Sequence, residues 1–335
     1  MAKNVDKPKP YTRVSVIGAG AWGTALAGVL AQVGHEVMIW AREPHVAALL
    51  REWHENRRHL PGVRLPDSVS ATTDIARACE AEILVLAVPA QHVRDILARL
   101  PDSALQKPIV VCAKGIERTT GKLLHEILRE AGCMSPALLS GPSFAHDVAV
   151  GLPTAVTIAA DVSFSSHLQG VFAHPSFRPY ASDDLIGVAL GGAAKNVYAI
   201  ACGTVAGMRL GESARAALIA RSFAELSRLA LALGARTETL MGLSGLGDLV
   251  LTATSASSRN YTFGLKLGSG VPVDQLKKPG GPLAEGVETA PALVARAKRA
   301  GVELPIAEVV TAVLDGTLAP ADAIPRLMQR PYRSE

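Results

Sequence analysis

One short segment near the start of the chain constrains the fold more than any other. Residues 18–23 read GAGAWG and fit the pattern GxGxxG, with a β-rich run before them and a helical pattern after them. In such a turn Gly18 permits the tight bend, Gly20 lets the backbone approach a pyrophosphate, and Gly23 lets the helix pack closely on the sheet. The segment therefore predicts a dinucleotide-binding turn at a helix N-terminus, with an ordinary strand-to-helix turn as the alternative.

Strand and helix patterns alternate along the first half of the chain. Expected strands cover 12–18, 35–41, 82–89, 108–115, 136–141 and 153–160, and expected helices cover 21–34, 44–56, 91–100 and 122–132. Because the strands are almost continuously apolar, we expect the sheet to be covered on both faces. The alternation predicts an α/β fold with an N-terminal Rossmann-type doubly wound sheet.

The strand pattern ends near residue 184, and helical patterns dominate beyond it. They cover 185–206, 212–233, 260–267, 289–300, 305–314 and 320–329, whereas the Gly-, Ser- and Pro-rich segments 244–260 and 271–286 read as loops. A chain of 335 residues is long enough for two domains. We therefore predict a flexible tail over 1–11, a Rossmann domain over 12–184 and an all-helical C-terminal domain over 185–335.

Composition and charge exclude several classes of protein. Hydrophobic residues make up 49% and charged residues 19% of the chain, which excludes a disordered protein. The net charge of +4 is small and the basic residues are dispersed, so nothing supports a nucleic-acid partner. The N-terminal decapeptide lacks the apolar run of a signal peptide, and the four cysteines are scattered as in reduced cytosolic proteins. We expect a cytoplasmic protein, and no His or Cys motif suggests a metal site.

An apolar stretch over Leu185–Met208 is long enough to cross a membrane, but Lys195 and Asn196 lie in its middle. A charge at a bilayer centre is costly, and no second span accompanies this one, so we interpret the stretch as a buried helix. Burial lowers the pKa of a lysine towards neutrality, which suits a general acid–base catalyst. The alternative is a lysine that extends from a helix end to solvent.

The end of the second predicted strand bears on the choice of nucleotide. Arg42 follows this strand directly, and an arginine there favours the 2′-phosphate of NADP(H). Glu43 is the next residue, and an acidic group suits the ribose 2′-hydroxyl of NAD(H), so use of NAD(H) stays open. A solvated surface arginine is the alternative.

Two further groups of polar residues lie where ligands are commonly bound. Ser258, Arg259 and Asn260 precede a predicted helix and offer hydroxyl, guanidinium and amide donors to an anion, with an ordinary capped helix as the alternative. Lys114 follows one strand, and Gly141 and Ser143 follow the next, at the edge where α/β sheets bind ligands.

Seven separated motifs, in order along the chain, carry a resemblance to a known family. They are GAGAWGTALA (18–27), KGIE (114–117), SGPSFA (140–145), GGAAKN (191–196), GLSGLGDLVLTATS (242–255), SRN (258–260) and AEGVETA (284–290). From Thr12 to Gln329 the chain resembles the bacterial-type NAD(P)-dependent sn-glycerol-3-phosphate dehydrogenases. This resemblance implies hydride transfer between NADP(H), or NAD(H), and a small phosphorylated triose. The reaction would interconvert dihydroxyacetone phosphate and sn-glycerol 3-phosphate, and so supply phospholipid synthesis.

The resemblance also implies roles for individual residues. Lys195 would be the catalytic acid/base and Asp248 would lie near it at the substrate, with a helix N-cap as the alternative for Asp248. The implied substrate-binding residues are Lys114, Gly141, Ser143, Lys195, Asp248, Ser258, Arg259 and Asn260. The cofactor-binding set is Gly18, Gly20, Ala21, Trp22, Gly23, Arg42, Lys114, Ala145, Arg259, Leu283 and Glu285. Ser143 replaces a Thr of some members, and Leu283 replaces a commoner Val.

Two other functions stay open from the sequence. A two-domain dehydrogenase acting on a keto or hydroxy acid would bind a carboxylate in place of the phosphate. A dinucleotide-binding regulator would bind cofactor without turnover, although the set of Lys114, Lys195, Asp248, Arg259 and Asn260 argues against it. The helical half, rich in Ala and Gly, is also compatible with a homodimer.

Overall fold

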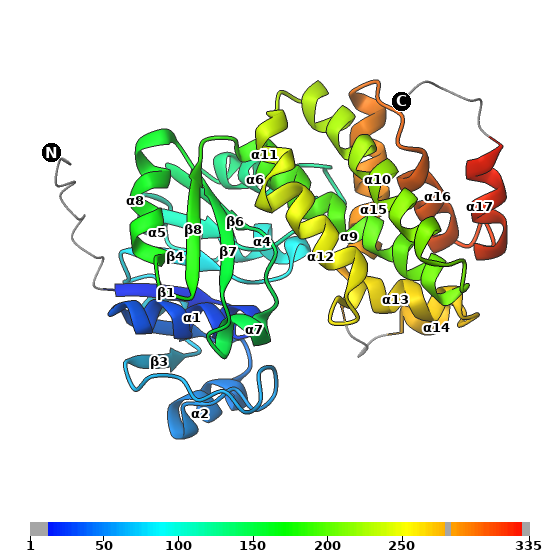
Figure 1. The fold of residues 1–335 in the computed structure, drawn as a ribbon. Coiled ribbons are helices and arrows are strands. Elements are labelled where there is room, and N and C mark those ends of the chain that lie inside the picture. Colours follow the sequence, from blue (N-terminus) through cyan, green and yellow to red (C-terminus); the bar gives the residue numbers. More distant parts are fainter. Residues whose placement is uncertain (1–12, 279–282, 330–335) are drawn as a thin grey trace, which may run out of the picture. The chain divides into compact units, whose positions relative to one another are not determined.

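Eight strands form one sheet in the part of the chain that this computed structural model describes, residues 13–278 and 283–329 (Figure 1). Their spatial order is β3-β2-β1-β4-β5-β6-β7-β8, and paired strands run parallel except for β6 and β7, which are antiparallel. The strands are β1 (Arg13–Ile17), β2 (Glu36–Trp40), β3 (Val69–Thr72), β4 (Ile83–Leu86), β5 (Pro108–Val111), β6 (Ser135–Ser140), β7 (Thr154–Ala159) and β8 (Phe177–Ser182). The predicted Rossmann-type sheet is thereby confirmed. The predicted tail 1–11 lies outside the described residues.

Helices connect these strands and supply the rest of the first core. They are α1 (Ala21–Val33), α2 (Pro44–Trp53), α3 (Ile75–Ala78), α4 (Val93–Leu97), α5 (Asp102–Leu105), α6 (Leu124–Glu130), α7 (Ala145–Ala149) and α8 (Val162–Phe172). Helix α1 packs against α7 and α8, whereas α4 packs against α6. All four residues of β4, ILVL, are buried, as a strand covered on both faces requires.

Two strands at the sheet edges are absent from the sequence prediction. β3 has only four residues, and β8 reads FRPYAS, with exposed positions alternating along it and a proline inside. Edge strands need less apolar surface than central ones and tolerate proline, so neither strand shows a strong pattern. The predicted helix 44–56 is too long, because α2 ends at Trp53 and His54 adopts the left-handed conformation with φ 49°.

The second compact unit is helical, which confirms the predicted fold class. Its helices are α9 (Leu185–Gly207), α10 (Glu212–Ala232), α11 (Thr237–Met241), α12 (Asp248–Thr254), α13 (Arg259–Gly268), α14 (Val273–Leu276), α15 (Glu285–Arg299), α16 (Pro305–Leu314) and α17 (Pro320–Met328). This unit also includes the segment Lys114–Leu123, which follows β5 in the chain. The sequence offers no signal for that placement, because the contacts that produce it are distant along the chain.

The predicted loop over 244–260 is wrong for most of its length. A π-helical turn, Leu243–Gly247, leads directly into α12. The glycines that suggested a loop serve close packing instead: a Cβ on Gly245 would lie 2.0 Å from the carbonyl oxygen of Leu240. The glycines of this segment are therefore explained by close contact with neighbouring backbone and not by a loop conformation.

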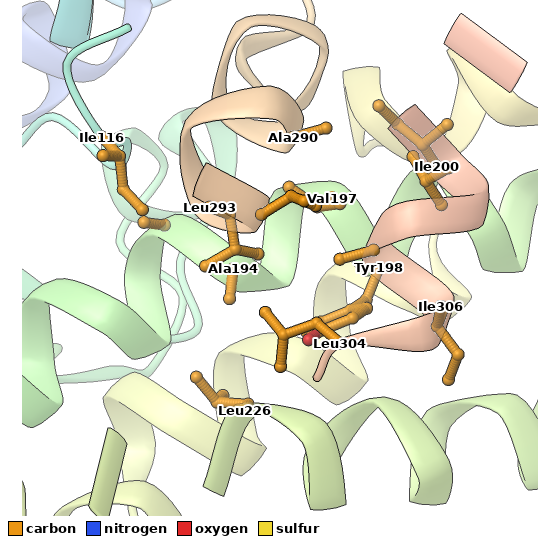
Figure 2. Packing of buried hydrophobic residues seen from close by; sticks show 14 of the residues in the cluster. Ile116, Ala194, Val197, Tyr198, Ile200, Leu226, Ala290, Leu293, Leu304 and Ile306 are labelled. Carbon is orange, nitrogen blue, oxygen red and sulfur yellow. The ribbon is translucent and has the colours of Figure 1, made fainter. Parts of the chain in front are cut away.

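Helix α9 is the centre of the second core. It is the one helix in the described chain that is long and apolar enough to cross a membrane, but 83% of its most apolar window is buried within the protein. Figure 2 shows Ala194, Val197 and Tyr198 on α9, with Leu293 of α15 and Ile306 of α16 among the residues around them. The apolar stretch is therefore explained by burial among other helices.

Candidate functional site

The glycine-rich turn follows β1 and ends where α1 begins at Ala21. Gly18 has φ +122°, and a Cβ there would lie 2.6 Å from the carbonyl oxygen of Ala87. A Cβ on Gly23 would lie 2.0 Å from the carbonyl oxygen of Gly18, whereas a Cβ on Gly20 would meet nothing within 4 Å. The turn thus excludes side chains on its packed side and leaves open space at Gly20. No side chain caps α1, so its first N–H groups suit a pyrophosphate.

The residues after β2 form a charged cluster. Nη2 of Arg42 lies 3.6 Å from Oε1 of Glu43, and Arg58 also donates to the Glu43 carboxylate. Glu43 is the N-cap residue of α2, and the Arg42 side chain is 73% exposed. Arg42 is therefore solvated and lies just after β2, as expected, and its contact with the nucleotide stays a prediction.

The residues after β6 form a second turn in the first unit. Gly141 has φ +147°, and a Cβ there would lie 2.9 Å from Cα of Val156. The Ser143 hydroxyl donates to the carbonyl oxygen of Gly141 at 3.1 Å, and α7 begins at Ala145. Because β6 runs parallel to β5, this turn lies at the carboxyl edge of the sheet, where ligands bind in such folds.

In the helical unit, one carboxylate holds two lysines. Nζ of Lys195, on α9, donates to Oδ1 of Asp248 at 2.6 Å. Nζ of Lys114 donates to Oδ2 of the same carboxylate at 2.6 Å. Asp248 is the first residue of α12, and the residue in the N-cap position is Gly247, so the N-cap alternative for Asp248 does not hold.

Burial gives these charges unusual properties. Lys195 is 7% exposed and Asp248 is fully buried, so Lys195 does not reach solvent from a helix end. Burial lowers the pKa of Lys195 to about 8; the charge of Asp248 opposes this shift and that of Lys114 adds to it. Burial alone raises the pKa of the Asp248 carboxyl, but Lys114 and Lys195 outweigh it and hold that pKa below its usual range. The pair stays charged near neutrality with a lysine poised to exchange a proton.

Thr252 is a further member of this cluster, and it was not predicted from the sequence. Its hydroxyl accepts a hydrogen bond from Nζ of Lys195 at 2.8 Å and donates to Oδ1 of Asp248 at 3.3 Å. Thr252 follows Asp248 by four residues, which places both on one face of α12. The four-residue spacing would have indicated Thr252 as a partner of Asp248 if residues 248–254 had been predicted as a helix rather than a loop.

A chain of amides links the lysines to α13 and α15. Nδ2 of Asn196 donates to the carbonyl oxygen of Lys114 at 3.3 Å, and Nδ2 of Asn260 donates to Oδ1 of Asn196 at 2.9 Å. Oδ1 of Asn260 accepts from the N–H of Gly286 at 2.9 Å. Asn260 thus holds neighbouring elements together, and its predicted contact with substrate stays a prediction.

The helix after Ser258 begins earlier than the sequence suggested, at Arg259. The Ser258 hydroxyl accepts from the N–H of Tyr261 at 3.2 Å and so caps α13, while Arg259 is exposed. This is the geometry of a capped helix, and it leaves the guanidinium at a helix N-terminus, where anions are favoured. Farther along the chain, Leu283 is 44% exposed and Glu285 is the first residue of α15.

Metal coordination has no candidate among residues 13–278 and 283–329. No group of three or more His, Cys, Asp or Glu side chains there is arranged to hold an ion.

A mostly parallel sheet with this glycine-rich turn, together with a helical unit that buries a lysine–aspartate pair, defines the class of two-domain dinucleotide-dependent oxidoreductases. Models of the N- and C-terminal domains of NAD-dependent glycerol-3-phosphate dehydrogenase match residues 13–164 and 184–325.

Known proteins extend this match to nearly the whole chain. A glycerol-3-phosphate dehydrogenase [NAD(P)+] of Parvibaculum lavamentivorans is 52% identical over 328 residues, covering 97% of this chain and 98% of the relative. The crystal structure of glycerol-3-phosphate dehydrogenase from Coxiella burnetii has TM-score 0.89 and 37% identity, covering 96% of this chain and 99% of that one. A ketopantoate reductase from Ralstonia eutropha, with TM-score 0.58, 17% identity, and coverage of 93% and 99%, shares only the fold. The chain belongs to the NAD-dependent glycerol-3-phosphate dehydrogenase family.

Proposed function

We propose that the protein interconverts dihydroxyacetone phosphate and sn-glycerol 3-phosphate with NADP(H), and also with NAD(H), as cofactor. The observation that carries this proposal is the buried Lys195 ammonium, held at 2.6 Å by Asp248 within a chain 52% identical to an enzyme of that name. In the cytoplasm the product would supply phospholipid synthesis. The four cysteines, all within the described residues, are buried and form no disulfide, which fits a reducing compartment.

Lys195 is the proton donor when the ketone is reduced. As the carbonyl carbon gains hydride, its oxygen gains negative charge and needs a proton. With a pKa of about 8, Lys195 is mostly protonated at pH 7 yet gives up its proton readily. In alcohol oxidation the neutral amine accepts the hydroxyl proton. The bound nicotinamide supplies or accepts the hydride itself.

Asp248 and Lys114 set the charge that surrounds this proton transfer. Asp248 favours the protonated form of Lys195 and fixes its Nζ, while Thr252 accepts a further hydrogen bond from it. Lys114 shares the Asp248 carboxylate, and its 14% exposed side chain adds positive charge that suits a phosphorylated substrate. Gly141 and Ser143 complete the substrate contacts that we propose.

The start of α13 binds the phosphate of the substrate in this proposal. Arg259 presents an exposed guanidinium in its first turn, with Ser258 and Asn260 beside it. A guanidinium fork at a helix N-terminus gives both the charge and the geometry for a phosphate. We assign the dinucleotide to Gly18, Gly20, Ala21, Trp22, Gly23, Arg42, Ala145, Leu283 and Glu285, with Lys114 and Arg259 reaching both ligands.

A substrate panel tests the proposal. NADPH oxidation is followed with dihydroxyacetone phosphate, with unphosphorylated dihydroxyacetone, and with pyruvate and ketopantoate, and NADH is run in parallel. We expect turnover with dihydroxyacetone phosphate far above that with the keto acids. Faster turnover of a keto acid would refute the substrate class, and cofactor binding without any oxidation would favour a regulator.

Arg259→Ala tests the phosphate site within the same panel. We expect kcat/KM for dihydroxyacetone phosphate to fall by about 1.5–3 kcal/mol of transition-state stabilisation, with little change for dihydroxyacetone. Equal losses for the two substrates would show that Arg259 does not bind the phosphate.

A further inference from the structure

The loop after α2 is fastened to the glycine-rich turn by one buried side chain. Asn56 is fully buried, and its Nδ2 donates to the carbonyl oxygen of Ala19 and to the hydroxyl of Thr24, both at 2.8 Å. Thr24 in turn donates to the carbonyl oxygen of Gly20 at 2.9 Å. Asn56 thus fixes the start of this loop to the backbone that the pyrophosphate is expected to approach.

The two arginines that follow Asn56 in the chain, Arg57 and Arg58, bind different partners. Nε of Arg57 donates to Glu55 at 3.1 Å, and its guanidinium carbon lies 4.4 Å from the ring centroid of Trp53. Arg58 instead donates to the carboxylate of Glu43, which follows β2. Only one of the two neighbours is therefore directed to the end of β2.

The Glu43 carboxylate is shared by two guanidiniums. Arg58 donates to its Oε2, and Nη2 of Arg42 lies 3.6 Å from its Oε1. Nε2 of His45 is 3.4 Å from the same carboxylate. The Arg42 and Arg58 side chains are 73% and 47% exposed, so a ligand can reach both. Two cations thus converge on one anion at the strand end where this fold holds the adenosine ribose.

We propose that Arg58 is a second specificity-determining residue for the 2′-phosphate of NADP(H), acting with Arg42, and that this phosphate displaces Glu43 as their partner. The inference rests on the proposed function. A phosphate dianion offers more charge and more acceptor oxygens than one carboxylate, so both guanidiniums gain from the exchange. Without the phosphate, Glu43 is available to the ribose 2′-hydroxyl of NAD(H), which accounts for use of both nucleotides.

Direct binding tests this assignment without any turnover. NADPH, NADH and 2′-phospho-ADP-ribose are titrated calorimetrically into wild type, Arg58→Ala and the matched control Arg57→Ala, with no triose present. We expect Arg58→Ala to weaken NADPH and 2′-phospho-ADP-ribose by about tenfold and to leave NADH within about twofold. Arg57→Ala should leave all three unchanged, because its guanidinium is engaged by Glu55 and Trp53.

Substitution of Glu43 should change the affinity for NADPH in the direction opposite to Arg58→Ala. Glu43→Gln removes the charge that repels the phosphate, so NADPH should bind more tightly and NADH more weakly. The proposal would be overturned if Arg58→Ala weakened the binding of NADPH and NADH equally, or weakened neither. It would also be overturned if Arg57→Ala lost as much NADPH affinity as Arg58→Ala. These titrations contain no triose, so their outcome does not depend on the proposed reaction. If the proposed reaction were wrong, the wild-type protein would bind nucleotide but would not reduce dihydroxyacetone phosphate.

Discussion

Nζ of Lys195 and Oδ1 of Asp248 lie 2.6 Å apart, and neither residue is more than 7% exposed. The second carboxylate oxygen is taken by Lys114 at the same distance. Because burial and Asp248 act on the pKa of Lys195 in opposite directions, this one carboxylate sets how readily the lysine releases its proton.

Asp248→Asn keeps the shape of the side chain and removes its charge. The pKa of Lys195 should then fall below about 8, so the alkaline limb of the pH profile of ketone reduction should move to lower pH. The buried Lys195 and the partly buried Lys114 would lose their counter-ion, which should lower the free energy of unfolding by about 3–5 kcal/mol. The pH dependence of kcat and urea unfolding measure these effects; an unmoved alkaline limb would contradict the role of Asp248.

Thr252→Val removes the hydroxyl that accepts from Lys195 while keeping the side-chain volume. A hydrogen bond to a charged group is worth about 1.5–3 kcal/mol, so kcat should fall by at least about tenfold. Thr252→Ser retains the hydroxyl and should recover most of the activity. If both variants behave alike in steady-state kinetics, the hydroxyl has no part in positioning the lysine.

Gly121→Ala probes how the Lys114 segment is held in the helical unit. Nη1 of Arg296 donates to the carbonyl oxygen of Gly121 at 3.0 Å. A Cβ on Gly121, at φ +69°, would displace the Arg299 guanidinium, which donates to the carbonyl oxygens of Thr120 and Gly121. We expect KM for dihydroxyacetone phosphate to rise several-fold and stability to fall by more than about 1 kcal/mol.

Gly132→Ala is the matched control for that substitution. Gly132 also has positive φ, at +84°, but a Cβ there would meet nothing within 4 Å. Gly132→Ala should lower stability because alanine is strained at positive φ, and it should leave KM for dihydroxyacetone phosphate unchanged. An equal rise in KM in both variants would show that the contact with Arg299 does not position Lys114.

Glu225 gives stability a pH dependence of its own. Its carboxylate accepts from the N–H of Ile306 at 2.7 Å at the start of α16, and burial raises its pKa from an ordinary 4.5 to about 7. The folded protein therefore holds this proton more tightly than the unfolded chain. The resulting stabilisation is complete below about pH 4.5 and is lost as pH rises through about 7.

Glu225→Gln should remove that dependence, which amounts to at most about 3 kcal/mol. Urea unfolding at pH 5 and pH 8 measures it, with Glu238→Gln, at an exposed position, as the control. A wild-type difference between the two pH values that persists in Glu225→Gln would assign it to other groups.

The sequence predicted those features that depend on local pattern. The glycine-rich turn has fixed spacing between a strand and a helix, and Lys195 stands out as a charge within an apolar helix. Thr252 and Asn56 were missed because their roles come from contacts between segments far apart in the chain. The π-helical turn before Asp248 concealed α12, since glycines packed against backbone look the same in sequence as glycines in a loop.

The most direct test of the central claim compares NADPH oxidation with dihydroxyacetone phosphate in wild type and in Lys195→Met, which preserves most of the side-chain volume. Loss of the general acid predicts a fall in kcat of about 10²–10⁴-fold, with NADPH binding unchanged in a separate titration. Turnover close to that of wild type would contradict the assignment of Lys195 as the proton donor.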